Sequence, residues 1–234
     1  MFMTNSVAKK SWICAAVAVA VLVVDQVLKI WIKTTYPIGG TVALIGDWCK
    51  FYFVENEGMA FGMKFGGDVG KLLLSLFRIV ASAAIVVFLI KLLKQNARYT
   101  LLISMTLILA GAVGNVVDCC LYGLVFDEST HTQIATLFPE GGGYGRFLHG
   151  KVVDMFYFPI WEWTWPEWMP FVGGRDAEFF SAIFNVADAA VCTGVGLLLI
   201  DQLFFSPDKK KNNEEAKNDE LESPKEENTE ASQV

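Results

Sequence analysis

The chain has 234 residues, of which 53% are hydrophobic and only 19% are charged, and its formal net charge is −6. The mean hydropathy of +0.41 is higher than an ordinary water-soluble domain would have. Residues 206–234 hold nine acidic and five basic side chains and therefore account for four of the six net negative charges, so the rest of the chain is nearly neutral. This composition argues against a soluble domain.

Four apolar runs approach the roughly 20 residues that a helix needs to cross the hydrocarbon core of a bilayer. They cover about residues 11–32, 71–93, 99–120 and 179–205. The first run contains a small-residue stretch at 18–20 that resembles a signal-peptide cleavage site, but the run continues to Val24 and three further runs follow. We therefore expect an uncleaved first helix and an all-α membrane protein with four transmembrane helices, which form one domain over residues 1–205.

Basic residues predict the orientation, because short cytoplasmic loops carry an excess of Lys and Arg. If the four helices alternate, one side of the membrane receives Lys9, Lys10, Lys91, Lys94, Arg98, Lys209, Lys210 and Lys211. Both termini should then be cytoplasmic, and segments 33–70 and 121–178 should lie outside. The tail 206–234 has no aromatic residue and a single Leu, so we expect it to be a disordered acidic cytoplasmic tail.

The two outer segments have compositions of their own. Residues 41–54 are rich in β-branched and aromatic types around a turn-like Gly46-Asp47, which predicts a short strand or hairpin at the membrane surface. Residues 156–171 contain four Trp and three Pro, which predicts a non-helical stretch that seeks the membrane interface. We favour an interfacial anchor over a direct role in substrate binding.

Two of the apolar runs carry the same polar pair, Asn115 with Asp118 and Asn185 with Asp188. At a spacing of three residues on a helix, the amide and the carboxyl project from one face. A carboxyl at membrane depth is expensive unless a function keeps it there. Asp154 lies in another short apolar run, and two carboxyls that share a proton can hydrolyse an amide without a metal. The residues alone do not decide which two of Asp118, Asp154 and Asp188 would form such a pair.

Other hydrolase chemistries lack their residues. The two histidines, His131 and His149, form no HExxH motif, and the sequence contains no GxSxG elbow and no phosphate-binding GxxxxGK[ST] loop. The five cysteines have no metal-binding spacing. We therefore expect no metal and no organic cofactor.

Three further charged residues have plain structural interpretations. Asp25 and Lys29 are four residues apart, which suits an intrahelical ion pair. Arg78 lies near the outer end of the second run, where snorkelling to the interface would explain it. A non-enzymatic alternative also stays open, because buried Asn and Asp side chains can simply join helices in a small transporter or an assembly factor.

Five motifs occur in a fixed order along the chain. They are Asp25-Gln26-x-x-Lys29, Glu55-Asn56-x-Gly58-x-Ala60-Phe61, Gly114-Asn115-x-x-Asp118, Val152-Val153-Asp154 and Phe184-Asn185-x-Ala187-Asp188. This ordered set resembles bacterial lipoprotein signal peptidase, also called signal peptidase II, an intramembrane aspartyl protease with four transmembrane helices. A presenilin-like aspartyl protease is disfavoured because its YD and GxGD motifs are missing.

The resemblance implies a role for each matching position. Asp154 and Asp188 would be the catalytic pair. The residues that line the site and bind substrate or neighbouring groups would be Asn56, Asn115, Asp118 and Asn185. The supporting residues would be Asp25, Lys29, Gly58 and Gly114. Residues around 41–54 would form a small β-rich extracytoplasmic cradle over the site.

The resemblance also implies the substrate and the cellular location. The substrate would be a prolipoprotein with diacylglycerol on a cysteine, cleaved just before that cysteine. The protein would lie in the bacterial inner membrane as a monomer, with membrane lipid as its surroundings and no nucleic-acid partner.

The sequence departs from the family pattern at two places. Cys119 stands where the family usually has an Arg after the Asp of the GNxxD motif, and Arg146 or Lys151 is our candidate for a replacement cation. A segment from Cys120 to Phe147 and beyond also separates this motif from the VVD motif, and we expect it to form a flexible surface insertion.

Within that insertion, Asp127 follows a Gly-Leu-Val-Phe stretch that imitates the VVD motif. We favour Asp154 over Asp127 because an apolar run continues after Asp154, whereas polar residues follow Asp127.

Overall fold

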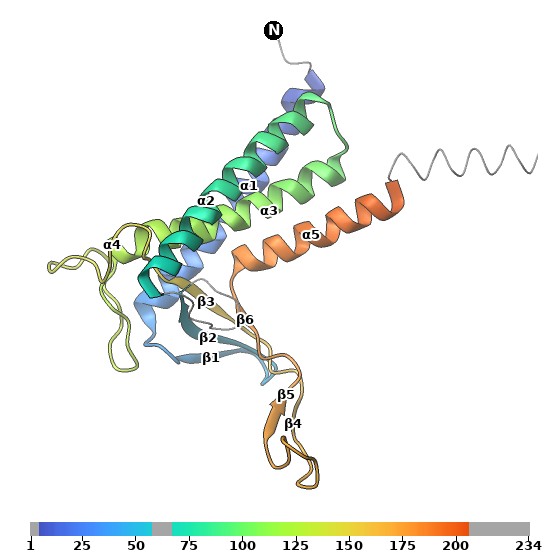
Figure 1. Ribbon diagram of the computed structural model, residues 1–234. Coiled ribbons are helices and arrows are strands. Elements are labelled where there is room, and N and C mark those ends of the chain that lie inside the picture. Colours follow the sequence, from blue (N-terminus) through green and yellow to red (C-terminus); the bar gives the residue numbers. More distant parts are fainter. Residues whose placement is uncertain (1–4, 58–66, 206–234) are drawn as a thin grey trace, which may run out of the picture.

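The computed structural model describes residues 5–57 and 67–205, and four long helices dominate it (Figure 1). They are α1 (Asn5–Thr35), α2 (Gly67–Lys94), α3 (Tyr99–Val117) and α5 (Val186–Phe205). Four helical segments are long and apolar enough to cross a membrane, and the third extends to Val125. The four predicted spans are confirmed, whereas the predicted disordered tail 206–234 and the motif residue Gly58 lie outside the described residues.

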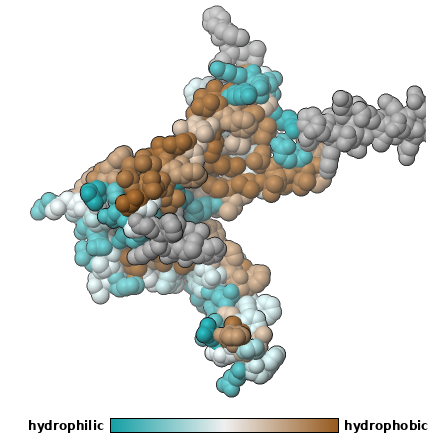
Figure 2. Space-filling model, viewed as in Figure 1, coloured by the Kyte–Doolittle hydropathy of each residue, from teal (hydrophilic) through white to brown (hydrophobic). Residues whose placement is uncertain are grey.

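The surface of the helical part is apolar. Exposed side chains such as Val19, Val27, Phe77 and Val87 point away from the protein, each with 59% or more of its surface accessible. Figure 2 shows hydrophobic residues over the helices and hydrophilic residues over much of the remainder. Such a surface is stable against lipid rather than water.

The structure corrects the ends of two predicted helices. The fourth helix was expected over 179–205 but begins at Val186, because Ile183–Phe184 (β6) pairs with a strand instead. The third helix continues as a π-helical turn, η2 (Asp118–Tyr122), and a single turn, α4 (Gly123–Val125). A wide π turn inside a helix is frequently found at functional sites.

A small antiparallel sheet covers one end of the helices and confirms the predicted β-rich cradle. Its order is β1 (Thr41–Ile45), β2 (Cys49–Asn56), β3 (Val152–Tyr157) and β6. The predicted hairpin at 41–54 is β1 and β2, which turn at Gly46 with a positive φ of 51°. In the next pair, Val54 lies opposite Asp154 and Glu55 opposite Val153, so β2 and β3 set the position of the VVD motif.

A second, two-stranded hairpin forms an arm that extends away from the helices (Figure 1). It consists of β4 (Glu162–Thr164) and β5 (Asp176–Glu178). The Trp-rich stretch is non-helical, as predicted, and Trp161 and Trp168 are 67% and 80% exposed. Its anchoring at the membrane interface stays a prediction.

The inserted segment contributes buried side chains to the core, although many of its residues between 131 and 142 are exposed. Phe126 is fully buried and Ala135 is almost so, and both belong to a cluster under the sheet. The other buried members of this cluster are Ile32, Phe51, Phe53, Tyr122, Val153 and Met155. The expectation of a plain surface insertion is therefore wrong, because apolar side chains of the insertion fill the space between the sheet and the end of α1.

The helices α3 and α5 approach each other closely. A Cβ added at Gly111 would collide with the backbone oxygen of Ala187 and would lie 2.7 Å from Val191 Cγ2. A Cβ at Gly194 would lie 2.7 Å from the backbone oxygen of Ser104. Glycine at these two positions lets the backbones meet, which holds the two predicted Asn–Asp pairs near each other.

Candidate active site

The pair Asn185 and Asp188 forms the cap that begins α5. The Asp188 backbone N–H donates to Asn185 Oδ1 over 2.9 Å, and the Asn185 N–H donates to Asp188 Oδ2 over 3.4 Å. This reciprocal arrangement is a capping box, which satisfies backbone donors at a helix start. The spacing of three residues thus has a local structural reason besides a shared helix face.

Amide side chains connect Asp188 with Asp154. Asn185 Nδ2 donates to Asp154 Oδ1 over 2.6 Å, and Asn115 Nδ2 donates to Asp188 Oδ1 over 2.8 Å. Asn56 Nδ2 donates to Asp154 Oδ2 over 3.3 Å. The sheet, α3 and the start of α5 each contribute to this group, so residues far apart in the sequence meet at one site.

The two carboxyls have different surroundings. Asp154 is 4% exposed, whereas Asp188 is only partly buried. Burial and, after it, the nearby charge of Asp188 raise the pKa of Asp154 to about 7, although hydrogen bonds from Asn185 and Asn56 act in the opposite direction. Near neutral pH the Asp154 carboxyl can therefore hold or release a proton, which suits acid–base hydrolysis.

A buried cation lies behind the carboxyl pair. Lys29 Nζ is 2.9 Å from Asp25 Oδ2, 2.7 Å from Asp118 Oδ2 and 3.0 Å from Asn115 Oδ1, and Lys29, Asp25 and Asp118 are fully buried. Asp25 Oδ1 also accepts from the backbone N–H of Ala187 over 2.8 Å. The predicted intrahelical pair is therefore present, but it also joins α1 to α3 and to the first turn of α5.

Asp118 contacts neighbouring protein groups and not the open side of the site. Besides Lys29, Gln26 Nε2 donates to Asp118 Oδ1 over 2.9 Å, and Tyr122 Oη donates to Gln26 Oε1 over 3.1 Å. Neither Gln26 nor Tyr122 was predicted from the sequence to contact the site, although Gln26 lies in the first of the five motifs. A Cβ on Gly114 would lie 2.8 Å from Asp25 Oδ2, so glycine makes room for the buried carboxylate.

The cation beside Cys119 is Arg78 of α2, and not Arg146 or Lys151 as we expected. Arg78 Nη1 lies 3.3 Å from Cys119 Sγ, so this side chain points toward the η2 turn. Snorkelling alone therefore does not explain Arg78, and the contact joins residues 41 positions apart. No spacing in the sequence could have indicated this partner.

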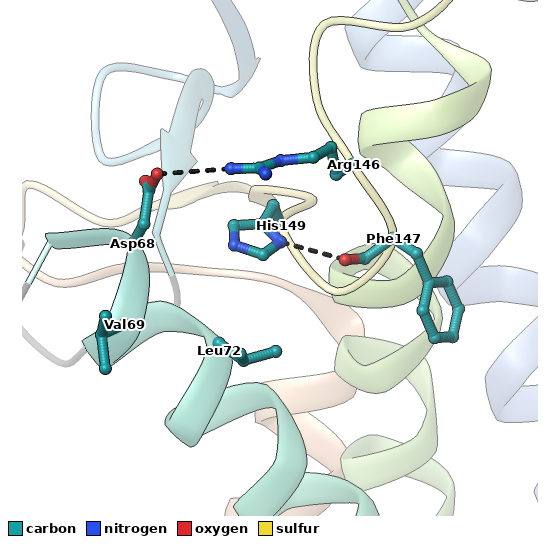
Figure 3. A pocket seen from close by; sticks show the side chains of 6 residues that line it. All are labelled: Asp68, Val69, Leu72, Arg146, Phe147 and His149. Carbon is teal, nitrogen blue, oxygen red and sulfur yellow. Dashed lines mark hydrogen bonds and ion pairs between the residues drawn. The ribbon is translucent and has the colours of Figure 1, made fainter.

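The two expected replacement cations lie elsewhere. Arg146 Nη2 is 3.6 Å from Asp68 Oδ2, and both side chains are about four-fifths exposed. Figure 3 shows this pair at a surface pocket of about 350 Å³. Lys151 Nζ lies 3.5 Å from Glu55 Oε2 and from Glu128 Oε1. The structure therefore does not bear out Arg146 or Lys151 as the neighbour of the carboxyl pair.

The rival Asp127 stays within the inserted loop. Its Oδ1 accepts the backbone N–H of Thr136, and Gln133 Nε2 lies 3.5 Å from its Oδ2. Asp154, by contrast, accepts a hydrogen bond from Asn185, the residue that also caps the start of α5 next to Asp188. Geometry thus places Asp154 beside Asp188. Within the described ranges, no group of three or more His, Cys, Asp and Glu side chains could hold a metal ion.

Comparisons with known proteins agree with this architecture. Residues 17–204 match a family model described as Signal peptidase (SPase) II. The lipoprotein signal peptidase of Porphyromonas gingivalis is 48% identical over 189 residues, which are 80% of this chain and 81% of the relative. That of Amoebophilus asiaticus is 34% identical over 197 residues, or 83% and 79% of the two chains. A solved bacterial membrane enzyme shares the fold with a TM-score of 0.55 at 24% identity, over 84% of this chain and 90% of that one.

Proposed function

The chain belongs to the signal peptidase II family, and from this membership we propose that it removes signal peptides from lipoproteins as an intramembrane aspartyl protease. The bond cleaved would be the one just before a diacylglyceryl-modified cysteine. The single observation that carries the proposal is the hydrogen-bonded arrangement of Asp154 and Asp188 around Asn185. It offers one buried carboxyl and one that water can reach.

In the proposed mechanism the two carboxyls share one proton and act together. The ionised carboxylate takes a proton from water, and the protonated carboxyl donates a hydrogen bond to the scissile carbonyl. Burial favours the proton on Asp154, whereas the partly exposed Asp188 is the better placed group to contact water. The titration belongs to the pair as a unit.

The surrounding amides and cation would hold the carboxyls still during this step. Asn115 and Asn185 orient them by donating from Nδ2. Lys29 contributes a positive charge behind the pair and fixes the oxygen of Asn115. Preorganised donors of this kind lower the barrier because they do not have to reorient as charge develops.

The membrane setting completes the proposal. The signal-peptide helix would enter laterally from the lipid, while the diacylglyceryl chains stay in the bilayer. The protein would be a multi-pass protein of the bacterial inner membrane with both termini in the cytoplasm and the sheet outside. It would act as a monomer on prolipoproteins.

The experiment is a gel-shift cleavage assay with a diacylglyceryl-modified prolipoprotein and protein purified in detergent. We expect wild type to cleave, and Asp154→Asn and Asp188→Asn to be inactive while keeping the thermal melting profile of wild type. Asp127→Asn is the matched control and should retain activity, because the side chain of Asp127 hydrogen-bonds within its own loop and not to Asp154 or Asp188 among the described residues.

Two results would contradict the proposal. A wild-type protein that leaves the modified substrate intact would favour a transporter or an assembly factor. Full activity of Asp154→Asn together with an inactive Asp127→Asn would mean that the dyad is assigned to the wrong residue.

A further inference from the structure

A second group of buried charges lies where α1 ends, outside the carboxyl pair. Lys33 is fully buried and forms an ion pair with Glu55, whose side chain is only 3% exposed. Lys33 Nζ also donates to Ser129 Oγ over 2.7 Å, and Ser129 Oγ donates to Glu55 Oε1 over 2.9 Å. These three side chains, which we call the Glu55 cluster, close a ring of polar contacts.

The inserted loop supplies much of what surrounds this cluster. Ser129 belongs to it, and the rings of Phe126 and Tyr144 each lie 5.2 Å from Lys33 Nζ. Lys151, just after the loop, is 3.5 Å from Glu55 Oε2. A segment that we expected to be a flexible surface insertion thus holds the ends of α1 and β2 together.

Stability alone does not explain such a cluster. A buried ion pair loses the hydration of both charges, and its attraction often does no more than offset this loss. The lasting effect of this buried pair is therefore on geometry, because the hydrogen bonds among Lys33, Ser129 and Glu55 fix how the three side chains lie. At this place, the geometry that is fixed is the end of strand β2.

That strand end carries one of the donors to the carboxyl pair. Successive side chains of a strand point to opposite faces, so Glu55 and the next residue, Asn56, leave β2 in opposite directions. In the β2–β3 register, Asn56 lies opposite Val152 and on the same face as Asp154, to which it donates over 3.3 Å. The contacts of the Glu55 side chain on one face of the sheet therefore hold the end of the β2 backbone in place. This backbone directs the Asn56 side chain toward Asp154 on the other face.

We propose that the Glu55 cluster is a positioning device, in which Ser129 of the inserted loop and Lys33 hold Glu55 and thereby keep Asn56 on Asp154. The catalytic role of the contact between Asn56 and Asp154 rests on the proposed function. The geometric part can be measured without substrate. Ser129, Lys33 and Glu55 are positioning residues, since they act through Asn56.

The readout is the titration of the Asp154 carboxyl, whose infrared band is identified by its loss in Asp154→Asn. Asp154 is faced by Asp188 and Asn185 at the start of α5, by Asn56 on β2 and by the charge of Lys29 on α1. The hydrogen bond from Asn56 favours the ionised form of Asp154. Ser129→Ala should weaken it, so the titration midpoint should move to higher pH and kcat should fall about tenfold, with KM nearly unchanged.

Matched variants separate positioning from folding. Thr132→Ala removes another hydroxyl of the same loop, one that hydrogen-bonds to Thr130 and to no other residue in the described part of the chain, and should leave the midpoint and kcat unchanged. Ser129→Thr keeps the hydroxyl and should restore the wild-type midpoint. If Ser129→Ala does not fold, the double variant Lys33→Met with Glu55→Leu replaces the ion pair by apolar side chains and should show the same upward midpoint shift.

Each result has a definite meaning. A shifted midpoint with reduced kcat supports the positioning role. An unchanged midpoint and kcat in folded Ser129→Ala, with or without a lower melting temperature, overturns it and leaves a purely structural cluster. If wild type fails to cleave while the midpoint still shifts, the proposed function is wrong and the positioning of Asn56 stands.

Discussion

The side-chain amide of Asn115 donates a hydrogen bond of 2.8 Å to Asp188 Oδ1. The oxygen of the same amide accepts from Lys29 over 3.0 Å. Because Lys29 can only donate, the oxygen must face it and the amino group must face Asp188. One amide therefore links the buried cation to the carboxyl pair and has a single orientation.

Asn115→Ala should lower kcat by about ten- to a hundredfold, since it removes a hydrogen bond to a charged group. Lys29 keeps Asp25 and Asp118 as partners, so the variant should fold. Steady-state cleavage kinetics and a melting curve in the same detergent check both parts. An unchanged kcat would mean that Asn115 does not orient Asp188.

The rate should depend on pH as a bell-shaped curve, because in the proposed mechanism the pair needs one proton. The pKa of Asp154 is raised to about 7, so above that pH both carboxyls ionise and kcat should fall. At acid pH both carboxyls become protonated and the base is lost. Asn56→Ala removes a hydrogen bond that favours the ionised form, so its alkaline limb should move to higher pH. Profiles of kcat between pH 4 and 10 test this, and an unmoved limb would contradict it.

Gly111→Ala should impair both stability and turnover. The added methyl group meets Ala187 and Val191, so α5 must move relative to α3, and these two helices carry Asp188 and Asn115. Overpacking of this kind typically destabilises by about 1–3 kcal/mol. We expect a lower melting temperature and at least about a tenfold loss of kcat. Gly196→Ala, where nothing lies within 4 Å of the new Cβ, is the control and should behave as wild type.

Lys29→Met should be among the most destabilising substitutions in the chain. It leaves Asp25 and Asp118 buried without their cation, which typically costs about 3–5 kcal/mol. The triple variant with Asp25→Asn and Asp118→Asn removes the uncompensated charges and should recover part of the melting temperature. If the single variant melts like wild type, the buried cation does not hold α1 to α3.

The spans and the cradle hairpin could be predicted from the sequence because their signals are local. An apolar run of about 20 residues or a turn at Gly46-Asp47 is visible without knowledge of the rest of the fold. The start of the fourth helix was missed because residues 179–184 are as apolar as a helix would require. Pairing of β6 with β3 and the Asn185 cap decide that boundary, and pairing depends on a distant strand.

The site was predicted in part. The positions of Asp154 and Asp188 came from a family resemblance, and the residues alone left Asp118 open as a candidate. Contacts such as Lys33 with Ser129 or Arg78 with Cys119 join residues 96 and 41 positions apart. A single sequence has no pattern for such contacts, because only the folded chain brings these side chains together.

The capping box at the start of α5 limits how this protein could escape an inhibitor. A compound that binds between Asp154 and Asp188 would contact Asn185. The side-chain oxygen of Asn185 accepts the Asp188 backbone N–H at the start of α5, and its Nδ2 donates to the Asp154 carboxyl. A resistance mutation at Asn185 or Asp188 would weaken drug contacts, but it would also unpair the first backbone donors of a membrane helix. Resistance at these positions would therefore carry a fitness loss through poor folding even before any loss of catalysis.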